Sequence, residues 1–88
     1  MKTLFKVIQQ TEVQTINTQN GQTSKSTLIL QELGGKYENT YAATLLGNQI
    51  RFYPNDHVFA ALRFTTREHN GQWYQDITIQ EIYSFIKA

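Results

Sequence analysis

The sequence predicts a small, single-domain, all-β protein. Thr and Gln are abundant and proline occurs once, and the Thr, Ile, Val, Tyr and Phe residues suit half-buried pleated surfaces. The dipeptides Asn20-Gly21 and Asn70-Gly71 are strong β-hairpin signals, because both residue types tolerate positive φ. From Val58 to Arg67, apolar and polar residues alternate with period two, a pattern from which a helix cannot build one apolar stripe.

Turn signals divide the chain into five extended segments. The first precedes Asn20-Gly21, and the second ends before Gly34-Gly35. Gly47-Asn48 and Pro54-Asn55-Asp56 bracket the connection from the third to the fourth, and Asn70-Gly71 joins the last two. A helix of one or two turns fits only at Asn48–Tyr53. The predicted strands are Leu4–Val13, Ser24–Glu32, Tyr37–Leu46, His57–Glu68 and Trp73–Phe85.

Alternation assigns a core face to the later segments. Leu28 and Leu30 alternate with Thr27 and Ile29 in the second strand. In the third, Tyr41 shares a core face with Ala43 and Leu45. In the fourth, the core face is Val58, Ala60, Leu62 and Phe64. In the fifth, Ile77 and Ile79 share a face with Trp73, opposite Tyr74.

Five strands with a short helical turn between strands three and four describe a five-stranded OB-fold barrel. Closing the sheet removes strand edges that would otherwise promote aggregation. An SH3-like barrel has the same strand count, but the placement of the Gly47–Tyr53 connection favours the OB order.

Size, charge and the missing cysteines set further expectations. A chain of 88 residues without cysteine has a modest core and no disulfide to supplement it, so we expect a homo-oligomer. No apolar run is long enough for a signal peptide or a membrane span, which predicts a cytoplasmic location and no membrane partner. Eight basic and seven acidic residues give a net charge of only +1, so phosphate binding would depend on the placement of a few cations.

Three segments resemble the bacterial single-stranded DNA-binding proteins, and more closely their short OB-fold relatives of unassigned function. These segments are Tyr41–Gly47, Asp56–Val58 and Thr66–Ile77, which contain an apolar strand ending in glycine, a turn, and an arginine-bearing hairpin. Lys6–Ile8 and Leu28–Leu30 also fit. The resemblance covers nearly the whole chain, and it implies the OB-fold and single-stranded DNA binding.

Two positions depart from the family pattern. Leu46 stands where those proteins usually place an aromatic residue that stacks on a base. His69 stands where they often carry tryptophan at the hairpin. The resemblance therefore implies the fold more firmly than it implies DNA binding.

Arginines and aromatic residues of the last hairpin are the candidate binding residues. Arg63 and Arg67 point the same way on the polar face of the fourth strand and could follow a phosphate track, with Arg51 and Lys25 as further cations. The alternative is a solvated face with cross-strand charge pairs to Asp76 or Glu81. The full set of candidate nucleic-acid-binding residues is Lys25, Arg51, Arg63, Arg67, His69, Trp73 and Tyr74.

Each aromatic candidate also has a structural interpretation. Trp73 and Tyr74 are adjacent in a strand, so one of them must face outward, and Tyr74 is the better stacking candidate. Trp73 is instead expected to plug one end of the barrel. His69 is by default an exposed loop histidine without a special role, and stacking or a phosphate contact is its alternative.

No catalytic, cofactor or metal motif is present in the sequence. The glycines do not have the spacing of a phosphate-binding loop, and the two histidines lack acidic or thiol partners at metal-ligand spacing. We therefore expect no enzyme, no cofactor and no small-molecule substrate. The sequence predicts single-stranded DNA binding with little sequence preference. The alternatives are a protein-interaction OB module without nucleic-acid binding, and single-stranded RNA binding.

Overall fold

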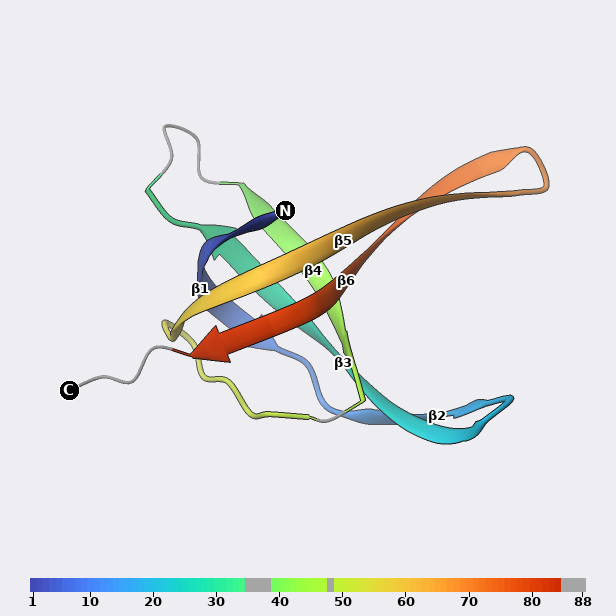
Figure 1. The fold of residues 1–88 in the computed structure, drawn as a ribbon, viewed down its shortest axis with the longest axis horizontal. Helices are drawn as coiled ribbons and strands as arrows, with labels where there is room; N and C mark the ends of the chain where they lie inside the picture. The colour runs from blue at the N-terminus through green and yellow to red at the C-terminus, as the bar shows by residue number, and fades with distance from the viewer. Residues whose placement is uncertain (35–38, 48, 85–88) are drawn as a thin grey trace.

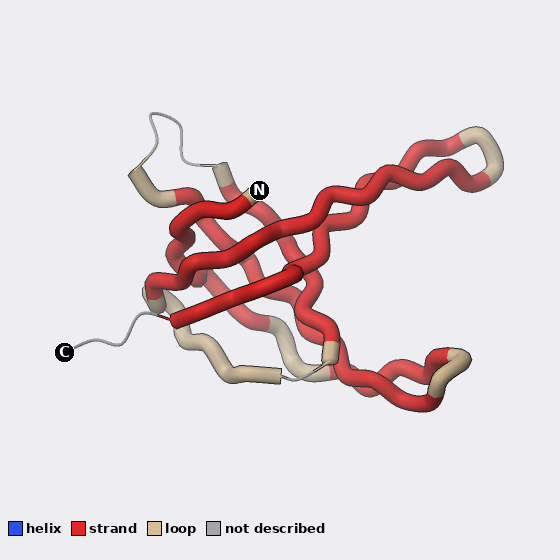
Figure 2. Tube along the Cα trace, viewed as in Figure 1, coloured by secondary structure: helices blue, strands red, loops and turns tan. Residues whose placement is uncertain are grey.

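The described residues form six β-strands, one more than the sequence predicted. The structure is a computed structural model that describes residues 1–34, 39–47 and 49–84. Figure 2 shows strands and loops but no helix among the described residues, which confirms the all-β prediction. No helix there is long and apolar enough to cross a membrane. The strands are β1 Lys2–Gln10, β2 Gln14–Thr18, β3 Gly21–Glu32, β4 Thr40–Leu46, β5 His57–His69 and β6 Gln72–Ser84.

Five of the six strands form a ring (Figure 1). The sheet order is β1-β5-β6-β4-β3-β2, and a further pairing between β1 and β3 joins its two halves. All pairings are antiparallel except that of β4 with β6, which is parallel and is held at Thr44 and Thr78. Ring closure leaves β2 outside, paired only with the beginning of β3.

β2 lies between Val13, where the first predicted strand ends, and the predicted Asn20-Gly21 turn, in a stretch to which the sequence assigned no strand. The chain leaves β1 after Gln10, and the Thr11 amide donates to the Thr27 carbonyl at 2.9 Å before β2 begins. β2 then pairs with the first residues of β3, and Thr18 lies opposite Gly21. Because Gln14–Thr18 is polar except for Ile16, it shows no apolar alternation that would have indicated a strand.

The second predicted hairpin turn is confirmed in its backbone conformation. His69 and Gln72 are paired, and the two residues between them, Asn70 and Gly71, have φ of 52° and 80°. Positive φ at both central positions is the turn geometry that matches the twist of the flanking strands. The first hairpin differs, because only Gly21 of the Asn20-Gly21 pair has positive φ, and Gly21 already belongs to β3.

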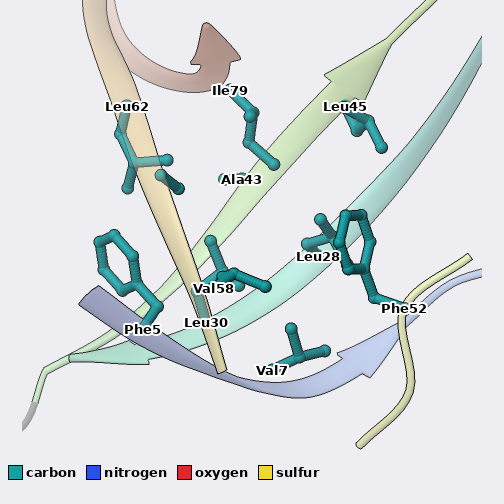
Figure 3. Packing of buried hydrophobic residues seen from close by; sticks show 11 residues of the cluster. Phe5, Val7, Leu28, Leu30, Ala43, Leu45, Phe52, Val58, Leu62 and Ile79 are labelled. Carbon is teal, nitrogen blue, oxygen red and sulfur yellow. The ribbon is translucent and has the colours of Figure 1, made fainter. Parts of the chain in front are cut away.

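The core fills the interior of the ring. Inward-facing residues of β1, β3, β4, β5 and β6 pack against one another, together with Phe52 from the loop before β5 (Figure 3). The predicted core positions Leu28, Leu30, Val58 and Ala60 are fully buried. The core residues are Phe5, Val7, Leu28, Leu30, Ala43, Leu45, Phe52, Val58, Ala60, Leu62 and Ile79.

The helical turn predicted between strands three and four is wrong for the described residues of that connection. Residues 49–56 are irregular, and residue 48 lies outside the described residues. The Phe52 amide donates to the Gln10 side chain at 2.8 Å instead of to a carbonyl one helical turn earlier. The Gln49 side-chain amide donates to the carbonyls of Leu45 and Ser24. These side-chain hydrogen bonds tie the segment to β1, β3 and the end of β4, and Phe52 packs in the core.

Replacement of Phe52 by alanine should destabilise the protein strongly. The ring of Phe52 is 3% exposed, and deletion of a buried phenylalanine side chain typically costs about 3–5 kcal/mol. Urea denaturation would measure the loss. Tyr53→Ala is the matched control, because the Tyr53 side chain is adjacent in sequence but 61% exposed. Its removal should change the free energy of unfolding by no more than about 0.5 kcal/mol. Equal losses in the two variants would contradict the role of Phe52 in the core.

Tyr41 links the core to the base of the last hairpin. Its ring makes edge contacts with Phe5 and Phe64, at centroid distances of 6.1 and 6.0 Å. Its hydroxyl donates to Glu32 Oε1 at 3.0 Å. Burial, and then the nearby Glu32 carboxylate, raise the pKa of Tyr41 above its ordinary value of 10.0. The neutral phenol is therefore favoured in the folded state.

This pKa shift predicts a loss of stability at alkaline pH. The pKa of Tyr41 is higher in the folded state than in the unfolded state. Its contribution to the stability of the fold is therefore complete below pH 10.0 and is lost as the pH rises through the folded pKa. Tyr41→Phe should remove this part of the alkaline slope in urea denaturation measured across that range. Tyr53→Phe should keep it. An unchanged slope in Tyr41→Phe would contradict the prediction.

Candidate functional site

The outer half of the β5–β6 hairpin projects beyond the ring as a two-stranded ribbon (Figure 1). We call residues 63–69 of β5 and 72–78 of β6 the arm. Every residue from Arg63 to Asp76 is exposed, whereas Leu62 is buried in the ring. No core layer covers the arm, so both of its faces are available for contacts with other molecules.

Strand register separates the side chains of the arm into two faces. Arg67 lies opposite Tyr74, and Arg63 lies opposite Thr78. Since cross-strand partners share a face, the arginines, His69 and Tyr74 lie on one side, which we call the arginine face. Trp73 lies opposite Glu68 on the reverse side. The structure thus brings together four of the predicted site residues and places Trp73 behind them.

Contacts on the arginine face centre on Arg67. Its guanidinium carbon lies 5.5 Å from the centroid of the Tyr74 ring, a cation–π contact. Its Nε donates to Asp76 Oδ2 at 3.0 Å, so the charge pair that was the alternative interpretation is present for Arg67. Tyr74 in turn donates its hydroxyl to Gln72 Oε1 at 2.6 Å. These contacts hold the Tyr74 ring against the Arg67 guanidinium, and the Asp76 carboxylate offsets the charge of that guanidinium.

The structure corrects the expectation that Trp73 plugs the ring. Its side chain is 69% exposed, and that of Tyr74 is 42% exposed. Trp73 does share a face with Ile77 and Ile79, as the alternation predicted, but only Ile79 is buried in the core. The face continues beyond the ring, where nothing packs against it. Trp73 is therefore available for contact with another molecule.

Arg63 stands at the base of the arm, and its side chain has no hydrogen bond or ion pair with another described residue. Arg63 begins a row of cross-strand partners on the outer surface of the ring. The row continues with Thr78 of β6, Thr44 of β4 and Thr27 of β3. Hydroxyl groups such as these are common phosphate ligands. Sequence reasoning missed the threonines, because alternation within a strand gives the face of each residue but not its register across four strands.

The other predicted cations lie apart from the arm. Lys25 is on β3 opposite Leu46, three strand spacings or roughly 14 Å across the strands from Arg63, and two residues further along them. Arg51 is exposed in the irregular segment before β5, where the neighbouring Ile50 carbonyl accepts from Gln10. The structure therefore does not combine Lys25, Arg51 and the arginines of the arm into one cluster.

The described part of the chain shows no pocket and no group of three or more His, Cys, Asp or Glu side chains that could hold a metal ion. The candidate site is an open, projecting surface.

Neither a protein-family model nor a curated protein sequence matches the chain. The resemblance to single-stranded DNA-binding proteins rests on the sequence segments described above.

Replacement of Trp73 by alanine should leave the fold intact. Exposed side chains without structural contacts usually contribute within about 0.5 kcal/mol, and Trp73 is the most exposed of the large apolar residues described. Urea denaturation of Trp73→Ala followed by circular dichroism would measure this. A loss comparable to that of Phe52→Ala would show that Trp73 packs against the ring.

Proposed function

We propose that this protein is an OB-fold protein that binds single-stranded DNA with little sequence preference. The OB assignment is supported by the order of strands in the ring. In chain order, the first ring strand pairs with the second and the fourth, and the third pairs in parallel with the fifth. In OB-folds, the second and third strands and the loops after the first and fourth strands bind oligonucleotides. Here those two loops are extended into the β2–β3 and β5–β6 hairpins.

One observation carries the functional proposal, namely the Arg67–Tyr74 cation–π pair on one face of the arm, with the exposed Trp73 on the reverse face. Proteins that bind single strands without sequence preference combine aromatic platforms for bases with cations for phosphates. Tyr74 offers a ring held in place by Arg67 and Gln72, and Arg63 offers an unpaired guanidinium at the base of the arm. Stacking accepts any base, which accounts for low sequence preference.

Asp76 sets the strength of this interface. A carboxylate 3.0 Å from Arg67 repels phosphate and competes for the guanidinium. The ion pair is largely exposed and contributes little to stability, about 0.2–1 kcal/mol. Asp76 thus acts mainly on ligand affinity, and its replacement separates electrostatics from folding.

Asp76→Asn should bind a labelled oligo-dT more tightly than the wild type and with a steeper salt dependence. A freed Arg67 adds one phosphate contact, which raises the logarithmic salt slope by about 0.7. Fluorescence anisotropy at several salt concentrations would measure both quantities. Arg67→Ala should weaken binding and flatten the slope. Tyr74→Ala should weaken binding roughly 10-fold with little change in slope, because stacking contributes about 1–3 kcal/mol per base and releases no counterions.

Arg51→Ala is the matched control, since Arg51 is an exposed arginine away from the arm. This variant should bind oligo-dT with the affinity of the wild type. Oligo-rU in parallel distinguishes a preference for DNA from one for RNA. Folded wild-type protein that binds neither oligonucleotide at low salt would exclude the proposal. The exposed tryptophan would then favour the protein-interaction module, because tryptophan is enriched among residues that dominate protein interfaces.

A further inference from the structure

A row of apolar side chains crosses the outer surface of the ring on the side of β1, β5 and β6. Phe5 and Ile82 face the core, so their neighbours in the strands face outward. Leu4 lies opposite Phe59, and Phe59 lies opposite Tyr83. Directly opposed side chains are about 4.5–5.5 Å apart at Cβ, so the three form a continuous strip. Leu4 is 41% exposed and Tyr83 60% exposed.

Charged side chains border this strip on both sides. Lys2 and Lys6 flank Leu4 on the outward face of β1, and Glu81 precedes Tyr83 on β6. None of these charges forms an ion pair with another described residue. We call the outward surface made by Lys2, Leu4, Lys6, Phe59, Glu81 and Tyr83 the wall. It exposes aromatic surface beside unpaired cations, the combination that binds single strands.

Arg63 connects the wall to the arginine face of the arm. Lys2 lies opposite Ala61, so Arg63 is its diagonal neighbour, about 7–8 Å away at Cα. β5 runs from the wall to the tip of the arm without interruption, and its outward positions carry no carboxylate from His57 to His69. At 3.3–3.4 Å per residue this track is roughly 40 Å long, about twice the length of the arm alone.

The excess of positive charge favours an anionic occupant over a second copy of this chain. With Arg63, the wall carries three cations and one carboxylate. Two copies docked wall to wall would place cations against cations, and like charges at an interface are unfavourable. A polyanion with exposed bases instead complements the lysines and Tyr83 together.

We propose that the wall is a second contact surface for single-stranded nucleic acid, continuous with the arm through Arg63. Phosphates bind Lys2 and Lys6, and a base stacks on Tyr83. This inference rests on the proposed function and assigns a longer path to the same ligand. None of the residues that define the wall was among the candidate binding residues predicted from the sequence. Those candidates lie on the arm or away from both surfaces.

Oligonucleotide length separates the wall from the arm. An oligo-dT of about 6 nucleotides spans the arm, whereas one of about 12 nucleotides also reaches the wall, and both lengths are within the range of site sizes for OB-folds. The longer ligand should show a salt slope steeper by about 1.4, corresponding to two more phosphate contacts. The double variant Lys2→Gln/Lys6→Gln should lose this increment and keep its affinity for the short ligand. Tyr83→Ala should weaken only the long ligand, and Tyr83→Phe should restore it.

Arg67→Ala is the internal comparison, because it should weaken both lengths. If the lysine variant and Tyr83→Ala bind the long ligand as the wild type does, while Arg67→Ala weakens both ligands, the wall is no part of the site and the proposed function stands. If the wild type binds neither length, both proposals fail. A wild-type dimer that Tyr83→Ala dissociates, with DNA binding unchanged, would show that a second copy covers the wall.

Discussion

The pairing of β1 with strands on both of its sides closes the ring, and the core depends on this closure. β1 pairs with β5 through its first half and with β3 through its second. Phe5, where the two pairings overlap, and Val7, which follows in the β1–β3 pairing, have no exposed surface. A slip of one residue in either pairing would turn both side chains to solvent. The irregularity in the β1–β3 register between Val7 and Gln9 bends the strand from one neighbour towards the other.

Local patterns in the sequence predicted the strands that face this core. Val58, Ala60 and Leu62 alternate because one side of β5 is buried, and Asn70-Gly71 adopts the φ values that its residue types favour. The two errors in the strand assignment have different causes. β2 pairs with the residues that follow it directly in the chain, but it is polar except for Ile16 and shows no apolar alternation. The segment before β5 is instead held by a partner distant in sequence, because the Gln10 side chain accepts from the Phe52 amide across 42 positions. No local pattern encodes that contact.

The candidate site was also predictable only in part, because alternation gives the face of a residue within its strand but not its partners on other strands. Alternation places Arg63 and Arg67 on one face and separates Trp73 from Tyr74. It does not show where the ring ends, and that limit decides whether Trp73 is buried like Ile79 or exposed. The diagonal pair of Arg67 with Asp76, like the row across β1, β5 and β6, depends on register between strands. Register follows from the packed fold rather than from any one segment.

The arm shares little with the core beyond its base, where Phe64 contacts Tyr41. Its strands are held by their own backbone hydrogen bonds and exposed side-chain pairs, so their local opening need not unfold the ring. Amide protons of the arm should therefore exchange with solvent by local fluctuation, and those of β1 and β3 only on global unfolding. A ligand that orders the arm must offset this motion before it gains affinity. In return, substitutions on the arm can alter binding with little effect on folding.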